Sequence, residues 1–126
     1  MAQQSAGFHE DIAVLKPETR DRHRAIASLM EELEAVDWYE QRIEGADDPG
    51  LAAILRHNSD EEKEHAVMVL EWLRRRDAVL DHNLRRFLFT EGDIAAPSAE
   101  ADPAPPSSST GATSLGIGGL RDKENL

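Results

Sequence analysis

The sequence predicts an all-α protein: an antiparallel two-helix hairpin, then a short third helix and a disordered C-terminal tail. Apolar residues recur at helical spacing over two long stretches. A turn rich in Gly and Asp separates these stretches at residues 45–50, and after residue 91 the composition changes to Ala, Pro and Ser. A hairpin of roughly 80 residues cannot hide two wide apolar stripes by itself, so we expect two hairpins to pair into a four-helix bundle.

Composition narrows the possible partners. The chain has 126 residues, no cysteine and a formal net charge of −11. Disulfides and thiolate metal sites are therefore excluded, and nucleic acid and anionic membranes are unfavourable partners, whereas cations are attracted. No apolar run is long enough to span a bilayer and the N-terminus shows no signal-peptide pattern, so we expect a cytoplasmic protein.

The first helix is predicted to begin at Pro17-Glu18-Thr19 and to run to about Glu44, with acidic residues early as the helix dipole favours. Glu32 and Tyr39 lie seven residues apart at one edge of its apolar stripe and are nearly aligned. A second, mostly acidic face carries the residues Glu31, Glu34 and Trp38. The stripe itself consists of Ile26, Leu29, Met30, Leu33, Val36 and Ile43, interrupted by Glu40, a rival ligand candidate.

The second helix is predicted to begin at Pro49, capped by Asp48, and to reach at least Arg76. A break is expected over residues 77–81, with Asp81 capping a third helix that ends near Thr90. His57 and His82 are expected at the surface.

The motif Glu62-x-x-His65 places a carboxylate and an imidazole on one face of the second helix, where they can hold one cation. We expect both side chains in the middle of the apolar stripe, where polar groups need partners. That stripe consists of Leu51, Leu55, Asn58, Glu62, His65, Val69, Trp72 and Leu80.

The register of the predicted hairpin places a third ligand, Glu32, beside this motif. Glu32 and Glu62 each lie 15 residues from Asp47 at the centre of the turn, so both should lie about 22 Å from it. One chain supplies one Glu and one Glu-x-x-His, whereas di-iron carboxylate bundles use two of each. Two chains would supply four carboxylates and two imidazoles, enough for two divalent cations.

These ligand types suit iron in both oxidation states, although manganese or zinc would also bind them. Tyr39, one heptad from Glu32, could act beside the metals as a hydrogen-bond or electron donor.

The segment Ser59-Asp60-Glu61-Glu62-Lys63-Glu64-His65-Ala66 resembles the Glu-x-x-His segment of ferritins, and Glu32-x6-Tyr39 resembles their first-helix pair. Ferritins carry four helices in one chain, and this chain stops after two. With its tail, it resembles the encapsulated ferritins, half-length cargo proteins of encapsulin nanocompartments, over residues 10–90 and 114–121.

This resemblance implies a ferritin-like four-helix bundle formed by two chains, a decameric ring of such dimers, and ferroxidase activity at a di-iron site of Glu32, Glu62 and His65. It implies an outer metal site at Glu31 and Glu34 beside Trp38. It also implies that Leu115, Ile117 and Leu120, within Ser114–Arg121, dock on the encapsulin shell, so that the protein lies inside the nanocompartment.

The predicted organisation is a helical metal-binding domain at 1–91, a flexible linker at 92–113 and a docking peptide at 114–126. Two alternatives to the ferroxidase stay open. One is a non-enzymatic helical assembly or adaptor whose carboxylates are structural or bind calcium or zinc, and the other is a di-iron protein that consumes peroxide.

Overall fold

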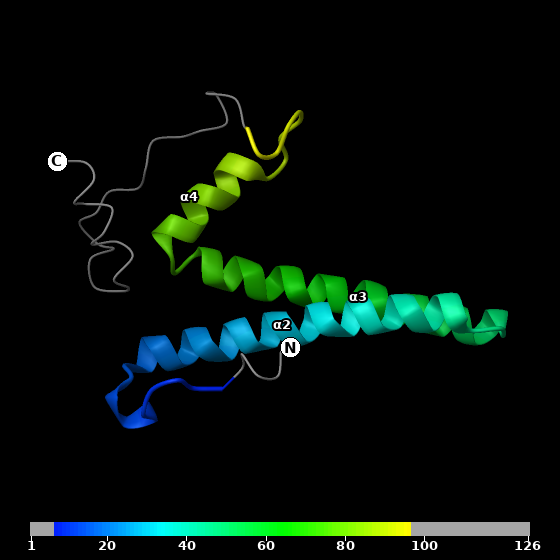
Figure 1. The fold of residues 1–126 in the computed structure, drawn as a ribbon, viewed down its shortest axis with the longest axis horizontal. Coiled ribbons are helices and arrows are strands. Elements are labelled where there is room, and N and C mark those ends of the chain that lie inside the picture. Colours follow the sequence, from blue (N-terminus) through cyan, green and yellow to red (C-terminus); the bar gives the residue numbers. More distant parts are fainter. Residues whose placement is uncertain (1–6, 97–126) are drawn as a thin grey trace. The chain divides into compact units, whose positions relative to one another are not determined.

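A computed structural model describes residues 7–96 and confirms an all-helical fold (Figure 1). The elements are a short 3-10 helix η1 (Ile12–Val14), then α2 (Pro17–Gly45), α3 (Pro49–Arg74) and α4 (Ala78–Phe87), and no strand occurs in this range. No helix in the described range is long and apolar enough to cross a membrane. The predicted docking peptide and all but the first five residues of the predicted linker lie outside it.

Helix α2 begins at Pro17, as predicted, and has Glu18 in its first turn. Helix α3 also begins as predicted, because the Asp48 carboxylate accepts a hydrogen bond from the Leu51 amide at 2.7 Å. Between the two helices the chain reverses, and α2 and α3 run side by side in opposite directions (Figure 1). The predicted antiparallel hairpin is therefore confirmed.

A narrow seam of mostly small side chains joins the two helices of the hairpin. The fully buried residues of α3 are Ser59, Ala66 and Leu73, spaced seven apart, and α2 has none. Several large apolar residues of the hairpin remain exposed in a single chain: Ile26, Leu33, Leu51, Ile54, Val67 and Met68. One hairpin thus buries little of its apolar surface, as the sequence predicted.

The junction between α3 and α4 differs from the prediction. Helix α3 ends at Arg74, two residues early, and Asp77 rather than Asp81 caps α4, accepting from the amides of Val79 and Leu80 at 3.0 Å each. Leu80 therefore belongs to α4, which ends at Phe87 rather than near Thr90.

Asp81 lies instead in the first turn of α4, where the guanidinium groups of Arg74 and Arg85 donate hydrogen bonds to it. These two cations, Arg74 first, lower the pKa of Asp81 below its ordinary 3.8.

The expectation of a surface position for His82 was wrong, because this side chain is buried. His82 lies on α4 one turn from Val79 and Arg86, which are themselves only partly exposed. The described residues form two compact units: the first ends at Leu73 and contains the hairpin, and the second begins at Arg74 and contains α4.

Candidate metal centre

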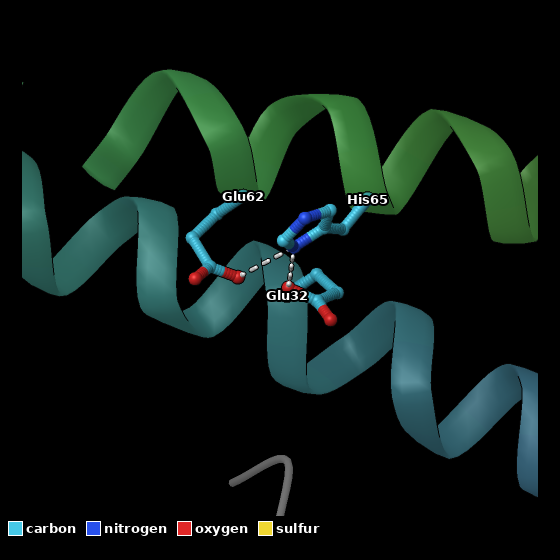
Figure 2. A group of neighbouring side chains, drawn as sticks. All are labelled: Glu32, Glu62 and His65. Atoms are coloured by element: carbon cyan, nitrogen blue, oxygen red, sulfur yellow. Dashed lines mark ion pairs between the residues drawn. The ribbon is translucent and has the colours of Figure 1, made fainter. Parts of the chain in front are cut away.

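Glu32 of α2 and Glu62 and His65 of α3 converge on one point between the helices (Figure 2). The Nδ1 atom of His65 lies 3.7 Å from Oε2 of Glu32 and 3.7 Å from Oε2 of Glu62. One ligand atom from each residue lies within 4.8 Å of the other two. Among the described residues, this is the only group of three or more such ligands.

The backbone explains why these three residues meet. Glu62 and His65 are three residues apart and share one face of α3, as the motif predicted. Glu32 lies opposite them because it is as far before the turn as Glu62 is after it. The small side chains of Ser59 and Ala66 flank the site along the seam and allow close approach of α2.

The site opens to one side of the hairpin. The side chains of Glu32 and Glu62 are 25% and 24% exposed, whereas that of His65 is 46% exposed. The expected place of His65 in the middle of the packed face is therefore corrected to its open edge. The packed face of α3 centres on Ser59, Ala66 and Leu73. A sequence pattern based on large apolar residues does not include Ser59 and Ala66, because their side chains are small.

The carboxyl group of Glu62 affects that of Glu32. A hydrogen bond with Glu62, then burial and the charge of Glu62, raises the pKa of Glu32 above its ordinary 4.5, and His65 opposes this shift. A carboxylate whose pKa is raised by a neighbouring carboxylate also favours a nearby cation, because a cation removes the same repulsion.

The donor set and its spacing fit a metal ion. Ligand atoms that share one ion at about 2.1 Å lie about 3.0 to 4.2 Å apart, and the two 3.7 Å separations fall within this range. Carboxylate oxygen and imidazole nitrogen bind divalent iron, zinc or manganese, so the donors alone do not identify the metal.

The other predicted site residues lie outside this group. Glu31 and Glu40 are exposed and Glu34 is half-buried, and none of them joins a cluster of three ligands in the described chain.

Tyr39 is half-buried, and Trp38 is 46% exposed. The Arg42 guanidinium lies 5.5 Å from the ring centroid of Tyr39 and 6.0 Å from that of Trp38. An open hollow of about 310 Å³ is lined by Trp38, Gln41 and Arg42. Sequence analysis missed Arg42, although its spacing of three and four residues from the two rings was a usable signal.

Comparisons with known proteins show the family to which the chain belongs. The sequence is 54% identical to an encapsulated ferritin-like protein of Rhodospirillum rubrum, over the whole of this chain and 96% of that protein. It is 49% identical to a ferritin-like protein of Thermotoga maritima, over 69% of this chain and 76% of that protein.

A solved structure has the same fold. The crystal structure of protein ne0167 from Nitrosomonas europaea superposes with a TM-score of 0.70 and 57% identity, over 71% of this chain and 99% of that chain. The EncFtn-like family model matches residues 7–91, the region that contains both helices of the hairpin and α4. These matches confirm the resemblance found in the sequence, and the chain belongs to the EncFtn-like family.

Proposed function

We propose that this protein is a ferroxidase that oxidises Fe(II) at a di-iron site shared by two copies of the chain. The observation that carries the proposal is the convergence of Glu32, Glu62 and His65 from two antiparallel helices. This set is half of what a di-iron carboxylate bundle requires, which is four carboxylates and two Glu-x-x-His imidazoles. A second hairpin related by two-fold symmetry supplies the other half.

The open edge of the site supports a shared centre. His65 is 46% exposed in one chain, and exposed apolar residues such as Leu51, Ile54 and Met68 lie on the same helix. A second hairpin that covers α3 buries this surface and brings the two half-sites together.

Bound metal would stabilise the dimer because it neutralises the carboxylates at the interface. Four carboxylates in one interface repel, by about 4 kcal/mol for each pair at 4 Å and an effective dielectric of 20, and two Fe(II) ions balance their charge. Each ion gives up one electron, and dioxygen takes up these two electrons and two protons and leaves as hydrogen peroxide. The resulting Fe(III) leaves the site and forms mineral.

Residues around the centre have supporting roles in this proposal. Glu31 and Glu34 form an outer site that attracts Fe(II) toward the centre, helped by the net charge of −11. Trp38 lies beside this outer site, and Tyr39 serves as a hydrogen-bond or electron donor beside the inner one.

The relative from Rhodospirillum rubrum is described as encapsulated. By analogy, we infer that this protein works inside an encapsulin nanocompartment in the cytoplasm, as a decameric ring held to the shell by Ser114–Arg121. That segment contains three apolar residues among glycines, Leu115, Ile117 and Leu120, which suit a short docking peptide.

Replacing His65 tests the reaction. The variant His65→Ala removes one of three ligands and should reduce the initial rate of Fe(II) oxidation in air at least about tenfold. The matched control is His57→Ala, which removes another exposed α3 histidine that pairs with a glutamate, Glu61, outside the site. Equal rates for the parent and His65→Ala would refute the enzyme and favour a non-enzymatic assembly.

A further inference from the structure

The most buried side chain in the described part of the chain carries a hydroxyl without a hydrogen-bond partner. Ser59 of α3 is 2% exposed, and its Oγ atom is unpaired. Buried hydroxyls are normally paired, because an unpaired one has lost its hydrogen bonds to water. The other buried residues of α3, Ala66 and Leu73, are apolar, so packing of the seam does not require a hydroxyl here.

Ser59 lies one helical turn before Glu62. Helical side chains lean toward the N-terminus of their helix, so the Glu62 side chain extends over the turn that contains Ser59. Figure 2 shows the Glu62 side chain leaving α3 on the side away from the His65 backbone, which is the N-terminal side. One of its carboxyl oxygens faces His65, and the other is directed away.

We propose that Ser59 is a positioning residue, whose hydroxyl donates a hydrogen bond to the Glu62 carboxylate when metal occupies the site. This inference rests on the proposed function. Without metal, the carboxyl groups of Glu32 and Glu62 interact with each other. A cation held by both would replace that interaction, and Ser59 is a buried donor within one turn of Glu62.

A hydrogen bond of this kind fixes the ligand against the metal. Carboxylates that bind metal ions are generally held by a second hydrogen bond, and loss of such a partner typically weakens metal binding about 10–100-fold. The hydroxyl thus lowers the stability of the metal-free hairpin and strengthens the metal-loaded site.

Two measurements on Ser59→Ala test this, because the proposal predicts weaker metal binding without a loss of stability in the metal-free protein. Anaerobic calorimetry with Fe(II) alone should show an affinity at least about tenfold below that of the parent. The thermal unfolding midpoint of the metal-free variant should not fall, because an unpaired buried hydroxyl has been removed and alanine favours helix. Ser59→Thr keeps the hydroxyl and should bind Fe(II) as the parent does.

Three results would overturn the proposal: unchanged affinity in Ser59→Ala, a lower unfolding midpoint in Ser59→Ala, or failure of Ser59→Thr to keep the parent's affinity. A lower midpoint would mean that the hydroxyl is structural, for example bonded to the Leu55 carbonyl. The variant His65→Ala separates this from failure of the proposed function. If His65→Ala binds Fe(II) as tightly as the parent does, the assignment of the metal site is wrong. If His65→Ala loses Fe(II) binding and Ser59→Ala keeps the parent's affinity, only the role of Ser59 is refuted.

Discussion

At the scale of single residues, Glu32 is a carboxyl group whose pKa is raised by its neighbours. Glu62 and burial raise its pKa above 4.5, so the folded protein holds this proton more tightly than the unfolded chain does. The resulting stabilisation of the metal-free protein is fully present below pH 4.5 and is lost as the pH rises through the folded-state pKa.

We therefore expect Glu32→Gln to remove part of the pH dependence of stability. Calorimetric unfolding in the presence of a chelator, from about pH 4 to pH 7, should show a midpoint that falls less steeply with rising pH in the variant than in the parent. The control is Glu40→Gln, which removes an exposed carboxylate of the same helix that lies outside the ligand group. Identical slopes in Glu32→Gln and the parent would contradict the raised pKa.

Which residues meet at the centre could be predicted, because the argument needs only helix geometry and the position of the turn. Equal distances of Glu32 and Glu62 from Asp47 place them opposite each other, and this convergence is confirmed. The exposure of His65 and the burial of Ser59 could not be predicted, since they depend on the rotation of each helix about its axis. The buried face of α3 carries Ser59 and Ala66, and a pattern of large apolar residues leaves them out.

At the scale of elements, the cap of α4 is a local determinant of the second unit. Its Asp77 carboxylate accepts hydrogen bonds from the amides of Val79 and Leu80 at 3.0 Å each. The helix has only ten residues, a length at which an isolated helix is marginal, so one lost cap is a substantial loss.

Asp77→Ala should lower the free energy of unfolding by about 1 kcal/mol, measured by urea denaturation, and should lower amide protection in α4. Fe(II) binding should not change, because the three ligands belong to the unit that ends at Leu73. Asp93→Ala is the control, since Asp93 accepts a comparable bond from the Ala95 amide outside any helix. If Asp77→Ala weakens Fe(II) binding as much as it weakens α4, the two units are not independent.

Helix starts were easier to predict than helix ends. The starts of α2 and α3 are marked by local chemistry alone. Pro17 and Pro49 have a fixed φ angle that suits the first turn of a helix, and Asp48 supplies a capping carboxylate. Around α4 two aspartates are candidates for the cap, and the sequence analysis chose Asp81 where the structure has Asp77. Asp81 is unavailable as the cap because Arg74 and Arg85 bind its carboxylate, a pairing that arises only after the chain has turned.

At the scale of the whole molecule, the proposed shared centre would make assembly depend on metal. Adding Fe(II) without oxygen should raise the solution mass of the metal-free protein to that of a dimer or a larger multiple, measured by analytical ultracentrifugation, and a chelator should reverse the change. His65→Ala should require more Fe(II) for the same shift, and His57→Ala should not. A mass that does not change with Fe(II) would exclude a centre shared between chains.

The segment 114–126 gives a separate prediction about location. Deleting it should leave the rate of Fe(II) oxidation unchanged, because all three ligands lie before residue 66. When the truncated chain is co-expressed with an encapsulin shell protein, it should be lost from purified shells. A scrambled segment of the same composition serves as the control. Retention of the truncated chain in the shells would refute the docking role.

The open position of His65 has a consequence for where iron chemistry takes place in a cell. On the proposed function, a freshly synthesised chain holds half of the ligands of the di-iron site, so it does not oxidise Fe(II) until it meets another copy. If the protein is confined in a shell, as proposed, the local concentration of copies is higher there, and mineral deposition is restricted to the place where the subunits are gathered. Single chains outside that place would not start iron mineralisation.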